Sequence, residues 1–108
     1  MKVSQLIGAE LDYWVGMTEG LEVEIKDGIC FQNVPDGKRI YSPSTNWAQA
    51  GEIIEKENIC WHENHGELIV EAGEVERGHI NLPLNTPKLI AGMRCYVTSR
   101  FGEAVAEK

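Results

Sequence analysis

The sequence has no long apolar run, no apolar leader and no excess of basic side chains. The longest uninterrupted apolar run spans only a few residues, so we expect no segment that crosses a bilayer. The first residues include Lys2, Ser4 and Gln5 in place of the apolar stretch of a signal peptide. Ten basic against seventeen acidic side chains leave a net charge of −7. Because binding to nucleic acid or to an acidic membrane needs clustered Lys and Arg, we expect neither as a partner.

Cysteine is also scarce, and the common catalytic motifs are absent. Without a signal peptide, the three cysteines indicate reduced thiols and a cytoplasmic location. Cys95 follows Arg94 and is the best placed of the three for a nucleophile, yet we expect it to pack as an inert side chain. The sequence contains no G-x-S-x-G, H-E-x-x-H or G-x-G-x-x-G pattern. These absences favour a protein that is not an enzyme, and we expect no cofactor.

A chain of 108 residues suits a single domain over residues 1–108, with residues 103–108 as a frayed tail. Apolar residues recur at helical spacing in three places. They predict helices over residues 4–20, 46–58 and 87–102. Thr86 is the expected N-cap of the third helix, with Pro87 at its first position.

Alternating apolar and polar residues predict short strands between these helices. Asp27-Gly28 is typical of a tight hairpin turn, within a meander of three strands over residues 21–41. Residues 72–85 are expected to form a loop with a short strand at residues 79–82. The order of the elements predicts an α+β fold, with an antiparallel sheet of about four to five short strands and three helices packed on it.

The helical stripes also predict which side chains form the core. We expect four side chains to be buried because each lies on the apolar stripe of its helix: Trp14, Trp47, Met93 and Val97. Asp12 lies on the thin remaining face of the first helix, together with Gly8 and Glu19.

A second apolar stripe on the first helix has no partner if the first stripe already faces the sheet. A two-fold dimer would bury such a stripe against its own copy. We therefore expect a homodimer through Leu6, Tyr13 and Met17.

Three potential metal ligands fall within six residues, at Cys60, His62 and His65. On a strand, Cys60 and His62 point to the same face, and His65 joins them only across a turn. Zinc needs four ligands, or three and a water, and this spacing matches no zinc motif. We expect instead that Cys60 is buried in the sheet and that both histidines are exposed near a hairpin tip. A metal-binding module that uses Cys60, His62 and His65 is the alternative.

A polar group stands ahead of the second predicted helix. Ser44 and its neighbouring hydroxyls suit N-capping, although the N–H groups of a helix start also receive carboxylates or phosphates. No lysine and no glycine-rich loop accompany them, so capping is the favoured interpretation. Asn46, Gln49 and Arg94 are polar side chains that packing does not require. A pocket near Ser44, Asn46 and Arg94 is therefore the alternative site, that of a small enzyme.

Acidic residues concentrate in one quarter of the chain. Residues 52–76 hold eight acidic residues and one lysine, a net charge of −7 that equals the charge of the whole chain. Such a run is either a solvated face or a surface complementary to a basic partner. We expect the second, with four exposed glutamates in contact with the partner: Glu52, Glu55, Glu63 and Glu67.

Three separated segments occur in an order that is distinctive. They are residues 11–15 (LDYWV), 41–51 (YSPSTNWAQAG) and 87–97 (PKLIAGMRCYV). Through them, nearly the whole chain resembles the NinX-like family of small phage and prophage proteins. The resemblance implies a phage accessory protein in the bacterial host cytoplasm and carries over no catalytic residues. Together with the charge pattern, it predicts a non-enzymatic interaction module that binds a host or phage protein.

Overall fold

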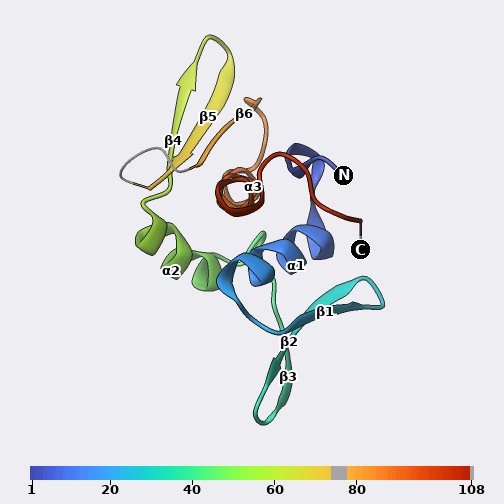
Figure 1. Ribbon diagram of the computed structural model, residues 1–108. Coiled ribbons are helices and arrows are strands. Elements are labelled where there is room, and N and C mark those ends of the chain that lie inside the picture. Colours follow the sequence, from blue (N-terminus) through green and yellow to red (C-terminus); the bar gives the residue numbers. More distant parts are fainter. Residues whose placement is uncertain (74–77, 108) are drawn as a thin grey trace.

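The structure, a computed structural model, describes residues 1–73 and 78–107. Its elements alternate between helices and hairpins, which confirms the α+β class (Figure 1). In chain order they are η1 (a short 3-10 helix, Val3–Gln5), α1 (Gly8–Glu19), β1 (Val23–Lys26), β2 (Ile29–Val34), β3 (Gly37–Ile40), α2 (Trp47–Glu57), β4 (Cys60–Asn64), β5 (Glu67–Ala72), β6 (Gly78–Pro83) and α3 (Lys88–Phe101). Residues 74–77 of the expected loop and Lys108 lie outside the described residues.

The strands form two sheets, and the single sheet expected from the sequence is wrong. Both are antiparallel and three-stranded, in the orders β1-β2-β3 and β4-β5-β6. The first is the predicted meander, with Lys26 paired to Ile29 across the Asp27-Gly28 turn. The sheets are separate because α2 intervenes between β3 and β4, and because α1 packs on the first sheet while α3 packs on the second. Figure 1 shows the hairpins projecting from opposite ends of the molecule.

Helix α3 lies at the centre of the fold. It packs against η1, α1, α2 and all three strands of the second sheet (Figure 1). Most of its residues are therefore buried, and the predicted burial of Met93 and Val97 is confirmed. Gly92 is required here because a Cβ atom at this position would lie 2.8 Å from Cζ2 of Trp61 on β4. Pro87 occupies the N-cap position with no side-chain cap, so the expected Thr86 cap is wrong.

Helix α1 buries an apolar stripe and, unexpectedly, a carboxylate. Leu11 and Val15 are fully buried, and Trp14 is only 9% exposed, as predicted. The Asp12 side chain, on the thin polar face of the helix, is buried, and its Oδ1 accepts a hydrogen bond of 2.8 Å from the Ser44 backbone N–H. Burial raises the pKa of Asp12, and the hydrogen bond from Ser44 opposes that rise.

The three residues expected to mediate a homodimer differ in how far they are buried within the chain. Leu6 lies between η1 and α1 and is fully buried in the core. Tyr13 is half-buried, with its ring edge-on to that of Trp14 at 5.3 Å between centroids. Met17 remains 39% exposed. Helical spacing predicted one stripe because it assumed a single helix from residue 4. In the structure the chain before α1 forms a separate 3-10 helix, η1, and Leu6 follows it.

Helix α2 begins and ends as predicted but turns a predicted core residue outward. Asn46 caps its start, since Oδ1 accepts hydrogen bonds from the N–H groups of Ala48 and Gln49 at 2.9 and 3.3 Å. Asn58 ends it in the left-handed conformation. Ala50 and Ile53 face the core, whereas Trp47 is 58% exposed, so its predicted burial is wrong. At 100° per residue, Trp47 lies at the edge of the face that Ala50 and Ile53 define.

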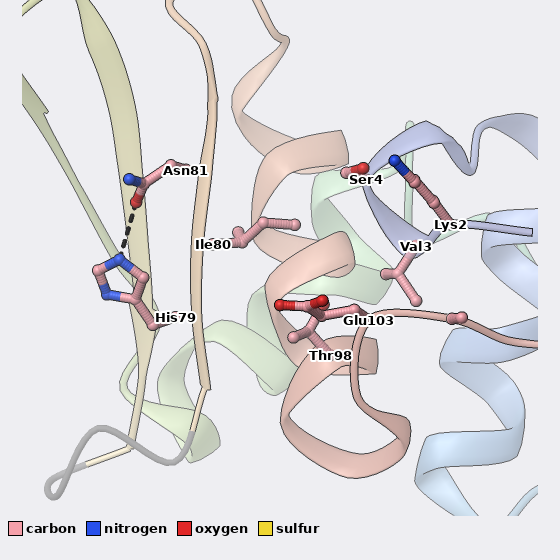
Figure 2. Close-up of a pocket in the computed structure, with 9 residues that line it drawn as sticks. Lys2, Val3, Ser4, His79, Ile80, Asn81, Thr98 and Glu103 are labelled. Atoms are coloured by element: carbon pink, nitrogen blue, oxygen red, sulfur yellow. Dashed lines mark hydrogen bonds between the residues drawn. The ribbon is translucent and has the colours of Figure 1, made fainter.

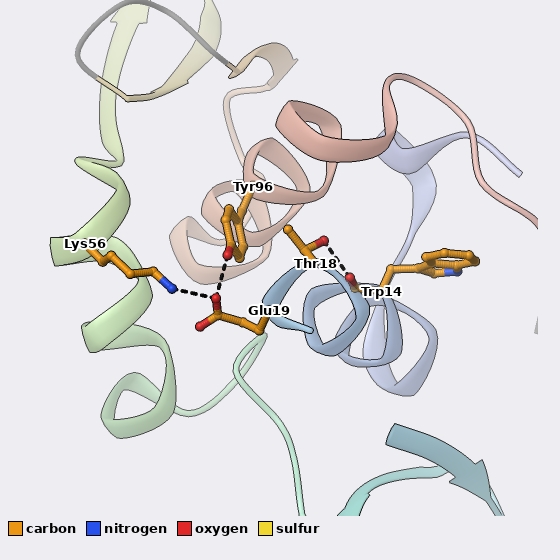
Figure 3. Close-up of polar contacts among 5 residues, drawn as sticks. All are labelled: Trp14, Thr18, Glu19, Lys56 and Tyr96. Atoms are coloured by element: carbon orange, nitrogen blue, oxygen red, sulfur yellow. Dashed lines mark hydrogen bonds and ion pairs between the residues drawn. The ribbon is translucent and has the colours of Figure 1, made fainter. Parts of the chain in front are cut away.

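One carboxylate ties the three helices together (Figure 3). Oε2 of Glu19, the last residue of α1, accepts hydrogen bonds of 2.6 Å from Tyr96 Oη on α3 and from Lys56 Nζ on α2. Burial, together with this hydrogen bond to Glu19, raises the pKa of Tyr96, so the phenol stays protonated as a donor. The contacts hold α2 in place against the rest of the helical layer.

The chain ends pair with each other, in contrast to the expected frayed tail. The Val3 N–H donates to the Glu103 carbonyl at 2.9 Å, and the Val105 N–H donates to the Met1 carbonyl at 2.9 Å. An isolated antiparallel bridge joins Lys2 to Ala104. Residues 103–105 are thus bound to the N-terminal segment by backbone hydrogen bonds. The sequence did not predict this pairing because backbone groups carry no residue-specific pattern.

We predict that Trp14→Ala lowers the free energy of unfolding by about 3–5 kcal/mol, because it empties a packed site against Tyr13 and Phe101. Trp47→Ala is the matched control, since an exposed side chain changes stability by only about 0.5 kcal/mol. Urea unfolding of the two variants checks this. Equal losses would contradict the placement of the two indoles.

We predict that Asp12→Asn gains stability over the parent as the pH rises. Because burial raises the folded-state pKa of Asp12 above 3.8, the stability that its protonated form contributes is complete below that pH and is lost as the pH rises through the raised pKa. Asn keeps an Oδ1 acceptor for Ser44 and does not ionise. Urea unfolding from about pH 4 to about pH 7 should show the variant gaining stability relative to the parent as the pH rises. Parallel curves would refute the buried carboxylate.

Candidate functional site

The polar residues ahead of α2 make structural hydrogen bonds. The Ser44 N–H binds Asp12, and Asn46 caps α2. Gln49 folds back on the incoming chain, where Oε1 accepts from the Ser42 N–H at 2.6 Å and Nε2 donates to the Ile40 carbonyl at 3.1 Å. The side chains of Asn46 and Gln49 therefore satisfy backbone groups around the turn, which is the capping interpretation rather than a ligand site. Ser44 takes part through its backbone N–H alone, and its Oγ is buried with no hydrogen-bond partner among the described residues.

Arg94 lies apart from that group. It is buried on α3, where its Nε donates a hydrogen bond of 2.8 Å to the Leu6 carbonyl, and burial lowers its pKa. Across the described residues, no hydrogen bond joins Arg94 to Ser44, Asn46 or Gln49. The structure thus brings Ser44, Asn46 and Gln49 together at the start of α2. It places Arg94 elsewhere, in contact with the segment between η1 and α1.

The Cys60, His62 and His65 group is also divided. Cys60 and His62 lie on the outer face of β4, where Cys60 is exposed, so its expected burial is wrong. His65 occupies the hairpin turn with φ 52°. His62 instead faces Glu71, with 3.9 Å between Nε2 and Oε1. Within residues 1–73 and 78–107, no three ligating side chains are grouped so that they could hold a metal ion.

A histidine from the third strand also reaches Glu71, which sequence spacing did not show. Nδ1 of His79 lies 3.9 Å from Glu71 Oε1, while Nε2 lies 2.8 Å from Asn81 Oδ1. The strand register places His79 directly opposite Glu71, and Glu71 directly opposite Cys60. The alternation of side chains in each strand was a signal that these residues could share one face of the sheet. It becomes informative only when the pairing of β5 with both β4 and β6 is known.

The buried thiols are unsuited to nucleophilic chemistry. Burial raises the pKa values of Cys30 and Cys95 to about 12, with a smaller contribution from the charge of Asp12 at Cys30. The Cys95 Sγ donates to the Val70 carbonyl at 3.4 Å. The prediction that Cys95 is a packed side chain is confirmed.

The four glutamates expected at an interface are all exposed, but they form two groups. Glu52 and Glu55 lie on the outer face of α2. Glu63 and Glu67 lie on β4 and β5 beside the turn that joins these strands. Because this turn projects away from α2, the two pairs do not make one patch (Figure 1).

The outer face of α2 combines charge with an exposed indole. Trp47, Gly51 and Glu55 follow one another at intervals of four residues and so share one side of the helix. Nothing lies within 4 Å of where a Gly51 Cβ atom would be, which leaves the space beside Trp47 open. Lys56, on the other flank, is bound to Glu19. The sequence did not predict that Trp47 lies on the surface. The available signal was its position as the first residue of α2, directly after the Asn46 cap.

No helix within the described residues is long and apolar enough to cross a membrane.

We predict that the purified protein carries no stoichiometric zinc, because the ligating side chains of the described residues do not converge. Elemental analysis of protein purified without chelator checks this. About one zinc per chain, lost in both Cys60→Ser and His62→Ala, would contradict it.

Comparison with known proteins gives one result that bears on identity. No curated protein matches the chain. A family model described as "Bacteriophage P22, NinX" matches residues 2–100. The match includes η1, all three helices and both sheets, and it confirms the resemblance inferred from the three sequence segments. The chain belongs to the family of bacteriophage P22 NinX.

Proposed function

We propose that this phage protein is a non-enzymatic interaction module that acts in the host cytoplasm by binding a basic surface of a host or phage protein. The outer face of α2 is the binding surface. The observation that carries the proposal is the exposure of Trp47, at 58%, on a helix whose other large apolar side chains pack inward.

An exposed indole on a rigid helix supports a binding role because its burial by a partner is strongly favourable. Trp is enriched among the few interface residues that contribute about 2 kcal/mol or more to binding. The start of α2 is fixed by the Asn46 cap, and its end is held by Lys56 bound to Glu19. Little conformational entropy is therefore lost when Trp47 meets a partner.

The charge of the same face supports a basic partner. Glu52 and Glu55 are exposed on the same helix as Trp47, with no cation bound to either among the described residues. Lys56 points its ammonium to Glu19 instead of to this face (Figure 3). Complementary charge mainly speeds association and selects partners, so its effect weakens as salt screens it.

We predict that substitutions on α2 weaken binding without unfolding the protein. The parent is used as bait in cells infected by the phage, and the captured protein is then purified for association and dissociation rates by surface plasmon resonance. Trp47→Ala should speed dissociation and weaken affinity by about 30-fold or more, since a Trp anchor contributes about 2 kcal/mol. Glu52→Gln with Glu55→Gln should slow association at low salt and have little effect at high salt.

The hairpin glutamates give the matched control, because Glu63→Gln with Glu67→Gln removes the same charge at a distance from α2. This pair should change the association rate less than the α2 pair. A partner that binds the Trp47→Ala variant as tightly as the parent, or that responds equally to both charge pairs, would overturn the proposal.

A further inference from the structure

We propose that the cleft beside β6 binds an extended segment of another protein, which adds to the second sheet as a further strand. The cleft belongs to β6 and the chain ends, and none of its lining residues lies on α2. The inference therefore stands independently of the α2 surface.

The cleft lies against the open edge of a sheet. In the order β4-β5-β6, β6 pairs with β5 on one side, and no described residue pairs with it on the other. Backbone N–H and C=O groups on such an edge are left without sheet partners, and an extended chain is the ligand that satisfies them at regular intervals. The cleft has a volume of about 520 Å³, within the range of protein ligand sites.

The opposite wall restricts what enters. Figure 2 shows Ile80 of β6 on one side, the terminal residues Lys2, Val3 and Ser4 on the other, and Thr98 of α3 between them. The second wall is held in place by the Lys2–Ala104 bridge and by the hydrogen bond from Val3 to Glu103. Because the cleft lies between these two walls, the occupant that we propose is a single extended chain and not the sheet of a second folded copy.

The lining side chains indicate the chemistry of that strand. Thr98 Oγ1 is buried and has no hydrogen-bond partner among the described residues. Since an unpaired buried hydroxyl is costly, a side chain that hydrogen-bonds at this point is favoured. Lys2 and Glu103 both line the cleft, so its charged side chains are one cation and one anion and favour a strand without a large net charge of either sign. On the far side of β6, His79 and Asn81 bond to each other and point away from Ile80 (Figure 2).

Short peptides of random sequence displayed on yeast provide the probe. Peptides are selected on the full-length protein, and their affinities are measured by the polarisation of a fluorescent label. Ala104→Trp places a large side chain in the cleft and should weaken binding by at least about tenfold. Ala106→Trp, on the same tail but outside the cleft lining, is the matched control and should bind as the parent does.

Two further measurements keep the result decisive if Ala104→Trp disturbs the chain ends. N-methylation of successive peptide amides should abolish binding at alternate positions, because only every second N–H of an added strand faces β6. Thr98→Val, which replaces the hydroxyl with a methyl group, should change which peptides are selected at the position facing α3. Failure to select any peptide, binding that neither Ala104→Trp nor N-methylation weakens, or N-methylation effects without a two-residue period would overturn the proposal.

Discussion

The hydrogen bond between the Asp12 carboxylate and the Ser44 N–H fixes the turn on which the rest of the surface depends. A buried carboxylate is costly unless it is bonded, so the chain from Ser42 to Asn46 is held against α1. From that fixed point, Asn46 caps α2 and Gln49 ties the helix back to the incoming strand. The direction of α2, and hence the outward position of Trp47, therefore depends on a contact between two residues that are 32 positions apart in the chain.

The parts of the fold that depend on local chemistry were predictable. Gly20, Asn58 and Gly102 end their helices as their conformational preferences indicate, and all three have positive φ. The Asp27-Gly28 turn correctly placed the first hairpin. What the sequence did not show is which strands share a sheet, because alternation marks a strand without naming its neighbour. The pairing of the chain ends was also missed, because it is made by backbone groups alone and leaves no pattern in the side chains.

The candidate sites show where pattern reasoning stops being sufficient. Trp47 was assigned to the core by its helical position, and it is exposed in the structure. Helical position likewise did not indicate that Asp12 is buried, because its burial depends on a tertiary partner, the Ser44 N–H. Arg94 was rightly singled out as unusual, yet its contact is with the Leu6 carbonyl, 88 residues away. The residue types indicated which side chains were unusual, but only the folded structure shows which of them are in contact.

The different surroundings of the tryptophans give the protein an internal optical reporter. The Trp14 indole is enclosed by Tyr13 and Phe101, while Trp61 donates its indole N–H to the Lys88 carbonyl and packs against Gly92. Trp47 stands in water. Emission from a hydrated indole lies at longer wavelength and is quenched by dissolved iodide, whereas a buried indole such as Trp14 emits at shorter wavelength and is shielded. Because Trp47 is the most exposed of the three indoles and Trp61 is only partly exposed, the red, iodide-sensitive emission comes chiefly from Trp47, and occupancy of α2 can be followed without attaching any dye.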